Sequence, residues 1–384
     1  MAGGVAILGA GGFVGARFVE LAVLGGRSDE VIPIVRAAKS VARTAHLGLT
    51  YRFGDASRPD SLARALEGCE AVVDLTKGSP ADIPRIAESV HAAALAARVR
   101  VLVHLSSATV YGQLERPDLA DDALPRLDHW MRYAREKGRA ENFLRERMGD
   151  GRLTIVVLRP GLIWGPGSPY VLESGSDLVR GAAYLVGDGG GICNLMYVDN
   201  LVRSIAAVVG HPAPASGFYN VADDETTTWR EFYGGLAAGL GVDPATIHLV
   251  PGGRYRAGLR DLRRDVQELS AYAWLKGRLS VEARAEVKRR LARALGRDLP
   301  DPPDTRGRPV VTREMHDLQT TRYRLPTAKF TATFGHQNTT SFAAGMASSL
   351  AWLRFIGVDA REEALPAPVA RSTDVLPARA GATI

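Results

Sequence analysis

Tyr133 and Lys137 lie four residues apart in the stretch "DHWMRYAREKGRAENFL", residues 128–144. In a helix this spacing places a phenol and an ammonium group on the same face, one turn apart. The pair is either an ordinary solvated pair on a charged helix, or a proton donor beside a cation that lowers its pKa. Because the same spacing arises by chance in many helices, the pair alone does not decide between these interpretations.

A second polar stretch, "HLSSATVYG", supplies hydroxyl groups in Ser106, Ser107 and Thr109. They follow an apolar run, and doubly wound sheets place their sites at the carboxyl ends of strands. A serine there could orient a substrate oxygen while Tyr133 exchanges a proton with a hydroxyl or carbonyl group. Lys137 would lower the pKa of the phenol and hold a cofactor ribose. This combination favours the catalytic interpretation.

The elements that must position these groups can be read from short apolar runs. Such runs are nearly continuous in apolar residues, which is typical of strands buried on both faces. We expect strands at residues 5–10, 30–36, 71–76, 101–107, 153–161 and 217–223. Helical periodicity is found at residues 13–25, 60–68, 83–98 and 341–357. This alternation predicts an α/β fold with a doubly wound parallel, Rossmann-type sheet and a smaller C-terminal α/β substrate-binding domain.

The first strand runs into "GAGGFVG", in which Gly9, Gly12 and Gly15 precede a helix. Backbone N–H groups at a helix N-terminus can bind a pyrophosphate only where no side chains occupy the turn. A glycine-rich turn alone is weak evidence, but here it follows a strand, opens a helix and lies one βαβ unit before a second strand. The sequence therefore predicts a dinucleotide site.

The second strand ends in "IVRAAKSVAR" rather than in an acidic residue that would bind an adenosine ribose. Arg36, followed by Lys39 and Arg43, could pair with a 2′-phosphate. This favours NADP(H), while NAD(H) is still possible because Arg36 could instead stack on the adenine or face solvent. Asp55, in "FGDAS", is placed to accept a hydrogen bond from the adenine amino group.

The domain organisation follows from a change of character beyond about residue 165, where Gly-rich loops replace strand–helix repeats. We predict a dinucleotide-binding domain at 1–165, to which 192–222 returns. A substrate-binding domain would comprise 166–191 and 223–358, with an unusual basic insertion at about 254–325. The Ala/Pro-rich tail at 359–384 is expected to be disordered.

The excess of positive charge is concentrated in one segment of the chain. The chain of 384 residues has a net charge of +6, and residues 254–297 hold 13 Lys/Arg against 5 Asp/Glu. Such a segment could meet an anionic substrate, a nucleic acid or a membrane, but a solvated helix pair is the simpler interpretation. Because its charges alternate with apolar residues at helical spacing and no aromatic platform accompanies them, neither nucleic acid nor membrane is expected as a partner.

Bulk composition is that of a soluble globular protein, at 46% hydrophobic and 23% charged residues. No apolar run is long enough to span a membrane, and the N-terminus lacks the basic region of a secretory signal. The two cysteines, Cys69 and Cys193, are too few for a disulfide framework or a cysteine zinc site. We expect a cytoplasmic protein without a metal.

The chain resembles the extended short-chain dehydrogenase/reductases of the NAD-dependent epimerase/dehydratase type. The resemblance rests on "GAGGFVG", "GDAS", "HLSSATVYG", "YAREK", "LRPGLIWGPG" and "MYVDNLV", in family order across residues 4–245, and it resumes in the closing helix. It implies that Ser107 orients the substrate hydroxyl, Tyr133 is the acid/base and Lys137 binds ribose.

Further site residues are also implied by the resemblance. The expected cofactor contacts are Gly9, Gly12, Phe13, Val14, Gly15, Arg36, Asp55, Ala56, Leu75, Thr76, Ser106, Tyr133, Lys137, Pro160 and Ile163. Phe13 and Val14 would lie against the pyrophosphate, and the segment 160–163 would contact the nicotinamide. The expected substrate contacts are Thr109, Cys193, Asn194 and Arg322. For Cys193 a small apolar core residue is an equal alternative.

Departures from the family pattern restrict which reactions of the family this chain is expected to catalyse. Dehydratases of this family carry Thr-Asp-Glu where this chain has Ser107-Ala108-Thr109, so an acid and base for eliminating water are missing. Sugar-nucleotide epimerases often place an arginine seven residues before the aspartate that corresponds to Asp199, where this chain has Ile192. The diphosphate clamp is therefore in doubt, although Arg322 or Arg324 could replace it.

The leading hypothesis is an enzyme that transfers hydride between NAD(P) and a secondary alcohol or ketone of a polar, sugar-like substrate, either free or linked to a nucleotide. The outcome is either net redox or epimerisation, and NADP(H) favours net redox. The alternatives are an NADPH-dependent reductase of a non-sugar ketone and a non-catalytic dinucleotide-binding protein. The resemblance makes a homodimer plausible.

Overall fold

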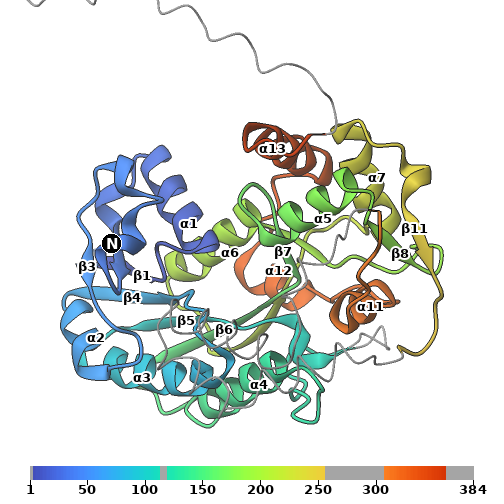
Figure 1. Cartoon of the computed structure of the whole chain (residues 1–384). Coiled ribbons are helices and arrows are strands. Elements are labelled where there is room, and N and C mark those ends of the chain that lie inside the picture. Colours follow the sequence, from blue (N-terminus) through green and yellow to red (C-terminus); the bar gives the residue numbers. More distant parts are fainter. Residues whose placement is uncertain (1–2, 113–118, 256–306, 360–384) are drawn as a thin grey trace, which may run out of the picture.

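The computed structural model describes residues 3–112, 119–255 and 307–359. Its main element is a parallel sheet of seven strands in the order β10-β6-β5-β4-β1-β2-β3 (Figure 1). The strand order reverses direction between β1 and β4, which is where doubly wound folds bind their ligands. The strands are β1 (Gly4–Leu8), β2 (Val31–Val35), β3 (Arg52–Phe53), β4 (Cys69–Asp74), β5 (Val101–Leu105), β6 (Thr154–Pro160) and β10 (Gly217–Val221).

Helices cover both faces of this sheet because alternate strand residues point to opposite sides. Val5 and Ile7 of β1 join the core beneath one helix layer, whereas Ala6 and Leu8 join the core beneath the other. The first layer contains α1 (Phe13–Leu24) and α6 (Val198–Gly210), and the second contains α2 (Pro59–Ala65), α3 (Ile83–Ala96) and α4 (Arg132–Arg145). The predicted doubly wound, Rossmann-type sheet is confirmed.

A second group of elements packs around Trp164, which is fully buried in a separate hydrophobic core. It contains two small parallel sheets, formed by β7 with β9 and by β8 with β11. Figure 1 shows these elements grouped together beside the main sheet. The members are β7 (Leu162–Trp164), α5 (Pro169–Val179), β8 (Tyr184–Val186), β9 (Leu195–Tyr197), α7 (Trp229–Leu240), β11 (His248–Val250), α11 (Arg313–Gln319) and α13 (Phe342–Phe355).

The remaining helices are short. α12 (Ala328–Phe334) packs against β10 and α6. Single 3-10 turns occupy Ser28–Glu30, Ala38–Val41, Ala45–Leu47, Pro80–Asp82, Ala108–Tyr111 and Pro244–Thr246. No helix in the described ranges is long and apolar enough to cross a membrane, and within them no group of three or more His, Cys, Asp or Glu residues could hold a metal ion.

The charged stretch at residues 128–144 is helical only from Arg132, where α4 begins. Met131 has extended backbone angles, and its N–H donates to Nδ1 of His129. The indole N–H of Trp130 donates to Asp317 at 2.7 Å. Asp317 belongs to α11, and this hydrogen bond keeps residues 128–131 from extending α4 toward its N-terminus.

The predicted domain boundaries stay a prediction, although residues 192–222 do supply α6 and β10 to the main sheet. Almost all of the basic segment at 254–297 lies outside the described residues, as do most of the Pro-rich loop at 299–309 and the tail at 359–384.

Candidate functional site

The turn after β1 is shaped by glycines that approach neighbouring backbone closely. Gly9 has a φ of +76°, a conformation that favours glycine, and a β-carbon there would lie 2.9 Å from the carbonyl oxygen of Leu75. A β-carbon at Gly15 would lie 2.3 Å from the carbonyl oxygen of Gly9, so α1 can pack onto the turn only without a side chain. Gly12 precedes the first residue of α1 and donates its N–H to Gly9. The turn therefore offers a helix N-terminus free of side chains, which fits a pyrophosphate.

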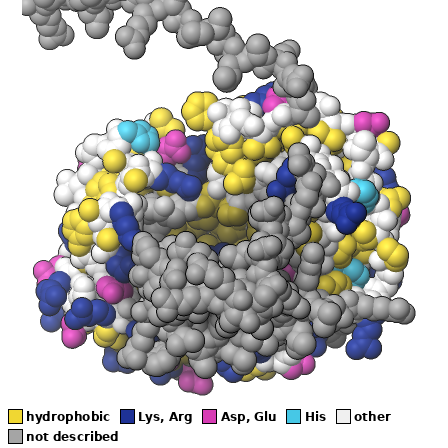
Figure 2. Space-filling model, in the orientation of Figure 1, with side chains coloured by type: hydrophobic (Ala, Val, Ile, Leu, Met, Phe, Trp, Pro, Cys, Tyr) yellow, Lys and Arg dark blue, Asp and Glu magenta, His cyan; other side chains and the backbone are white. Residues whose placement is uncertain are grey.

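The side chains around this turn are either half-buried or fully buried. Phe13 is half-buried, whereas Val14 is part of the core, so only the backbone of Val14 could meet a ligand. Leu75 and Thr76 follow β4 and are both half-buried beside Gly9. Figure 2 shows the face of the molecule hollowed in its centre, with hydrophobic side chains inside and Lys or Arg side chains on one rim.

The two polar residues expected at the adenosine end lie close to each other. Arg36 is exposed directly after β2, and its charge contributes to a lowered pKa of Asp55. The largest cause of that lowering is the hydrogen bond from the backbone N–H of Ser57, followed by the bond from its hydroxyl, both to Oδ1 of Asp55. Ala56 is half-buried in the same turn. Asp55 is thus an ionised acceptor held in a fixed orientation.

The three residues expected to transfer protons occur at neighbouring positions. Ser107 caps the 3-10 turn after β5, and its Oγ accepts hydrogen bonds from the N–H and the hydroxyl of Thr109. Tyr133 lies in the first turn of α4 and is hydrogen-bonded to Ser107. Lys137, one turn further along α4, donates from Nζ to the carbonyl oxygen of Leu105 at 2.6 Å. The structure therefore brings Ser107, Tyr133 and Lys137 together, while their catalytic roles stay a prediction.

The expected lowering of the Tyr133 pKa by Lys137 is wrong for this structure. Burial and, to a smaller extent, the charge of Glu314 raise the pKa of Tyr133, the hydrogen bond with Ser107 lowers it, and the net result is a pKa of about 12. The ammonium group of Lys137 is directed to the backbone of β5. Below pH 10 the phenol is accordingly a proton donor in the free protein.

Lys137 is itself buried between charged groups. Burial lowers the pKa of Lys137, while the charges of Asp74 and Glu141 oppose that lowering. Asp74 ends β4 and is buried, with Oδ2 at 2.9 Å from Nδ1 of His104. Its Oδ1 accepts from the N–H and hydroxyl of Thr76. Of the two ring nitrogens of His104, Nδ1 contacts Asp74, whereas the buried Nε2 has no partner among the described residues.

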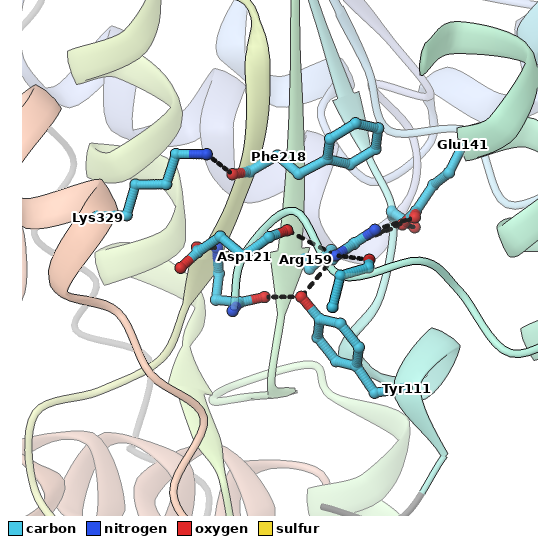
Figure 3. A network of polar contacts seen from close by, with 9 residues as sticks. Tyr111, Asp121, Glu141, Arg159, Phe218 and Lys329 are labelled. Carbon is cyan, nitrogen blue, oxygen red and sulfur yellow. Dashed lines mark hydrogen bonds and ion pairs between the residues drawn. The ribbon is translucent and has the colours of Figure 1, made fainter. Parts of the chain in front are cut away.

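A buried polar network lies one turn beyond Lys137 (Figure 3). Ser106 donates to Oε1 of Glu141 at 2.5 Å, and Arg159 of β6 pairs with both oxygens of the same carboxylate. Arg159 also donates to the hydroxyl of Tyr111, which donates to Asn220. Because the Ser106 hydroxyl donates its proton to Glu141, it has no proton left to donate to a cofactor.

Three of the four expected substrate residues have structural contacts. Cys193 is buried in the core around Trp164, and burial raises the pKa of its thiol well above the usual value, which favours the apolar alternative. Asn194 donates to the carbonyl oxygen of Tyr323 and accepts from the N–H of Leu325. Thr109 donates to Ser107, as described above. These side chains pack or form hydrogen bonds within the protein, where they stabilise loops, instead of facing a bound ligand.

The candidate replacements for the diphosphate arginine differ in their contacts. Arg322 is exposed, and Arg324 donates to the carbonyl oxygen of Asp223 at 2.9 Å. Ile192 is bound through its backbone to Thr321. The contacts of Arg322 and Arg324 do not mark either residue as one that would bind a substrate diphosphate.

The segment after β6 lies where a nicotinamide was expected to bind. Pro160 is buried at the end of β6, and Ile163 is half-buried against the core of the main sheet. Between them, a β-carbon at Gly161 would lie 2.3 Å from the carbonyl oxygen of Asn194. Gly161 therefore allows two backbone segments to meet under the site.

Sequence reasoning missed Glu314, in the first turn of α11. Its Oε1 accepts a hydrogen bond from the hydroxyl of Tyr170 at 3.0 Å, across 144 positions in the chain. No local pattern marks Glu314, because its contact with the site depends on how α11 packs.

Comparison with known proteins supports the dinucleotide site. A family model described as NAD(P)H-binding matches residues 9–183. The chain is 25% identical over 265 residues to a 2-alkyl-3-oxoalkanoate reductase of Shewanella oneidensis, covering 62% of this chain and 67% of that protein. It is also 25% identical over 260 residues to an N-acetyl-alpha-D-glucosaminyl-diphospho-ditrans,octacis-undecaprenol 4-epimerase of Escherichia coli O157:H7, covering 64% of this chain and 75% of that protein.

Solved structures of similar fold include a UDP-glucuronic acid 4-epimerase from Bacillus cereus in complex with UDP-glucuronic acid and NAD. The TM-score is 0.63 at 15% identity, and the match covers 92% of this chain and 99% of that one. At this level of identity the likeness shows the shared fold.

Proposed function

We propose that the chain is an extended short-chain dehydrogenase/reductase that catalyses hydride transfer between NADP(H) and a ketone or secondary alcohol of a polar, sugar-like substrate. The observation that carries this proposal is the hydrogen-bonded pair of Ser107 and Tyr133 with Lys137 one turn along α4. A protein that only senses a dinucleotide has no need of a phenol held against a serine hydroxyl.

The residues of the glycine turn fit the cofactor. Gly9 and Gly15 leave room at the N-terminus of α1 for a pyrophosphate, Asp55 offers an acceptor for the adenine, and Arg36 offers a cation for a 2′-phosphate. When bound, the nicotinamide supplies or accepts the hydride, so that a ketone is reduced as NADPH is oxidised.

The protein's own groups handle the proton. Ser107 holds the carbonyl oxygen by a hydrogen bond, and Tyr133 donates its phenolic proton to that oxygen as the alcohol forms. Solvent then returns a proton to the phenolate. The raised pKa of Tyr133, about 12, keeps the phenol protonated at neutral pH, as its role as proton donor in reduction requires. In the reverse reaction the same phenol must first lose its proton.

Net redox is favoured over epimerisation by Arg36 and its expected preference for NADP(H). A nucleotide-linked substrate is disfavoured, because Ile192 stands where epimerases of this family often have a diphosphate-binding arginine. The second candidate is reduction of a non-sugar ketone, and it is favoured by the oxoalkanoate reductase among the relatives.

The proposal can be tested without knowing the substrate. NADPH carrying deuterium at both C4 positions is incubated with the protein and metabolite extracts, and deuterium in the products is detected by mass spectrometry. We expect label transfer with the wild type and a loss of about 100-fold or more with Tyr133→Phe. Binding of NADPH without label transfer would instead support a non-catalytic protein.

A further inference from the structure

The segment that follows β2 runs along the glycine turn. It begins with Arg36 at the adenosine end, where the charge of Arg36 contributes to the lowered pKa of Asp55. Further along, the backbone of Ser40 lies directly against the turn, because a β-carbon at Gly11 would lie only 2.0 Å from the carbonyl oxygen of Ser40. The segment therefore leaves the adenosine end and crosses the turn toward α1.

Arg43, at the end of this crossing, lies beside the start of α1. A β-carbon at Gly167, in the loop after β7, would lie 3.5 Å from the ring of Phe13 and 4.0 Å from Nη1 of Arg43. Phe13 is the first residue of α1. Gly167 has a φ of +86°, a conformation that favours glycine, so this loop position presents no side chain to Phe13 and Arg43. The guanidinium thus lies beside the first residue of the helix whose N-terminus fits a pyrophosphate.

The backbone of Arg43 is held on both sides. Val41 packs against the core of the main sheet. Thr44 is buried, and its N–H donates to the carbonyl oxygen of Val41 at 2.8 Å. The carbonyl oxygen of Thr44 accepts from the hydroxyl of Tyr51, also at 2.8 Å. Because the side chain of Arg43 is exposed between these two anchored residues, its guanidinium is accessible to a ligand while its backbone is fixed.

The charge of Arg43 is not neutralised within the part of the chain that the structure describes, where Arg43 makes no hydrogen bond or ion pair. Arg17, on the next turn of α1, differs, because it donates to both carboxylate oxygens of Asp199, at 2.6 and 2.8 Å. The first turn of α1 contains no acidic residue, and its N–H groups form the positive end of the helix dipole. A guanidinium and a helix N-terminus therefore lie together in an arrangement that favours an anionic ligand.

We propose that Arg43 and the N-terminus of α1 together bind the pyrophosphate of the cofactor. This inference rests on the cofactor site of the proposed function. A guanidinium can donate two parallel hydrogen bonds to a phosphate, and the helix N-terminus supplies backbone donors to the same anion. The sequence places Arg36, Lys39 and Arg43 in one basic stretch as candidates for a 2′-phosphate. The fold separates the two arginines, so that Arg36 stays at the adenosine end while Arg43 meets the part of the cofactor that NADPH and NADH share.

This division predicts two different effects on cofactor affinity. A contact with the pyrophosphate contributes to the binding of NADPH and NADH alike, because both contain that group. A contact with the 2′-phosphate contributes to the binding of NADPH alone. Arg43 therefore raises the affinity for both dinucleotides without selecting between them, and the selection is left to Arg36.

Dissociation constants of three ligands, measured by isothermal calorimetry with the full-length protein, test this assignment. NADPH and NADH differ in the 2′-phosphate, and ADP-ribose contains the pyrophosphate without the nicotinamide or the 2′-phosphate. Arg43→Met removes the guanidinium and should weaken the binding of all three ligands by a similar factor, about tenfold or more. Arg36→Met should weaken the binding of NADPH by about tenfold and change that of NADH and ADP-ribose by less than about twofold.

Two further variants serve as controls. Arg43→Lys keeps the positive charge but loses the paired donors, so a smaller loss of affinity is expected than in Arg43→Met. Arg64→Met, at an exposed position of α2, should leave all three dissociation constants unchanged. Thermal unfolding without ligand should be the same for Arg43→Met and the wild type, since Arg43 has no partner among the described residues whose loss would destabilise the fold.

The pattern across the three ligands decides the outcome. A loss confined to NADPH in Arg43→Met would assign Arg43 to the 2′-phosphate and overturn the pyrophosphate contact. A loss for NADPH and NADH but not for ADP-ribose would assign it to the nicotinamide and overturn the proposal as well, as would unchanged constants for all three ligands. Undiminished deuterium transfer in Tyr133→Phe would count against the proposed function, and it would leave the binding result for Arg43 unaffected.

Discussion

Glu141 and Arg159 form a fully buried ion pair in which Nη2 of Arg159 lies 2.5 Å from Oε2 of Glu141. The pair joins α4 to β6, one helical turn beyond Lys137. Ser106 donates to the same carboxylate from the end of β5. The helix that carries Tyr133 and Lys137 is therefore fixed to two strands of the sheet by a single carboxylate.

Removing one partner of this pair should destabilise the protein strongly. In Glu141→Gln the guanidinium of Arg159 stays buried without its counter-charge, which typically costs about 3–5 kcal/mol. The free energy of unfolding, measured by urea denaturation followed by circular dichroism, should fall by that amount. Arg139→Met, which removes an exposed partner of Glu136, serves as the control and should cost less than about 1 kcal/mol. Equal losses in the two variants would contradict the structural role of the buried pair.

Tyr133→Phe should lower turnover by about 10²–10⁴ without unfolding the protein. The ring packs against Ile83, Ala87 and Ala140, and phenylalanine preserves those contacts. Deuterium transfer from labelled NADPH measures the chemistry, while isothermal calorimetry measures NADPH affinity, which should change little. Wild-type rates of transfer in this variant would show that the phenol is not the proton donor.

Arg36→Asp should reverse the cofactor preference. If the exposed guanidinium pairs with a 2′-phosphate, the wild type binds NADPH more tightly than NADH, and aspartate weakens NADPH binding by about 1–3 kcal/mol. Dissociation constants for both cofactors, measured by calorimetry, test this. Arg64→Asp changes the charge equally at an exposed position of α2 and should leave the preference unaltered. Equal affinities of the wild type for NADPH and NADH would rule out the contact.

Asp74 should make folding sensitive to acid. Burial acts to raise its pKa, but the hydrogen bond and charge of His104, the bond from Thr76 and the charge of Lys137 together lower it below the ordinary value. A carboxyl group whose pKa is lowered by folding stabilises the protein above its unfolded pKa of about 3.9, and that stabilisation is lost as the pH falls through the folded pKa.

In Asp74→Asn this part of the pH dependence should disappear. The free energy of unfolding, measured in urea between about pH 6 and pH 3, should decrease less steeply with acid in the variant than in the wild type. Asp60→Asn, at an exposed position of α2, is the control and should keep the wild-type slope. Parallel curves for Asp74→Asn and the wild type would exclude a linked proton at this site.

Local patterns in the sequence determined much of the fold. The apolar runs predicted six strands of the main sheet to within about two residues, because strands buried on both faces require continuous apolar sequence. The positions of Gly9 and Gly15 predicted the dinucleotide turn, since a positive φ and close backbone approach exclude other residues at these points. The spacing of Tyr133 and Lys137 predicted that both lie on α4.

Only the tertiary structure decided which other groups meet the site. Cys193 and Asn194 follow a glycine loop that resembles a pocket lining, yet packing around Trp164 and bonds to Tyr323 and Leu325 place them in structural positions. The pKa of Tyr133 depends on burial and on Glu314, which approaches from α11. Contacts between segments far apart in the chain depend on how helices and sheets pack, and the local sequence does not encode that packing.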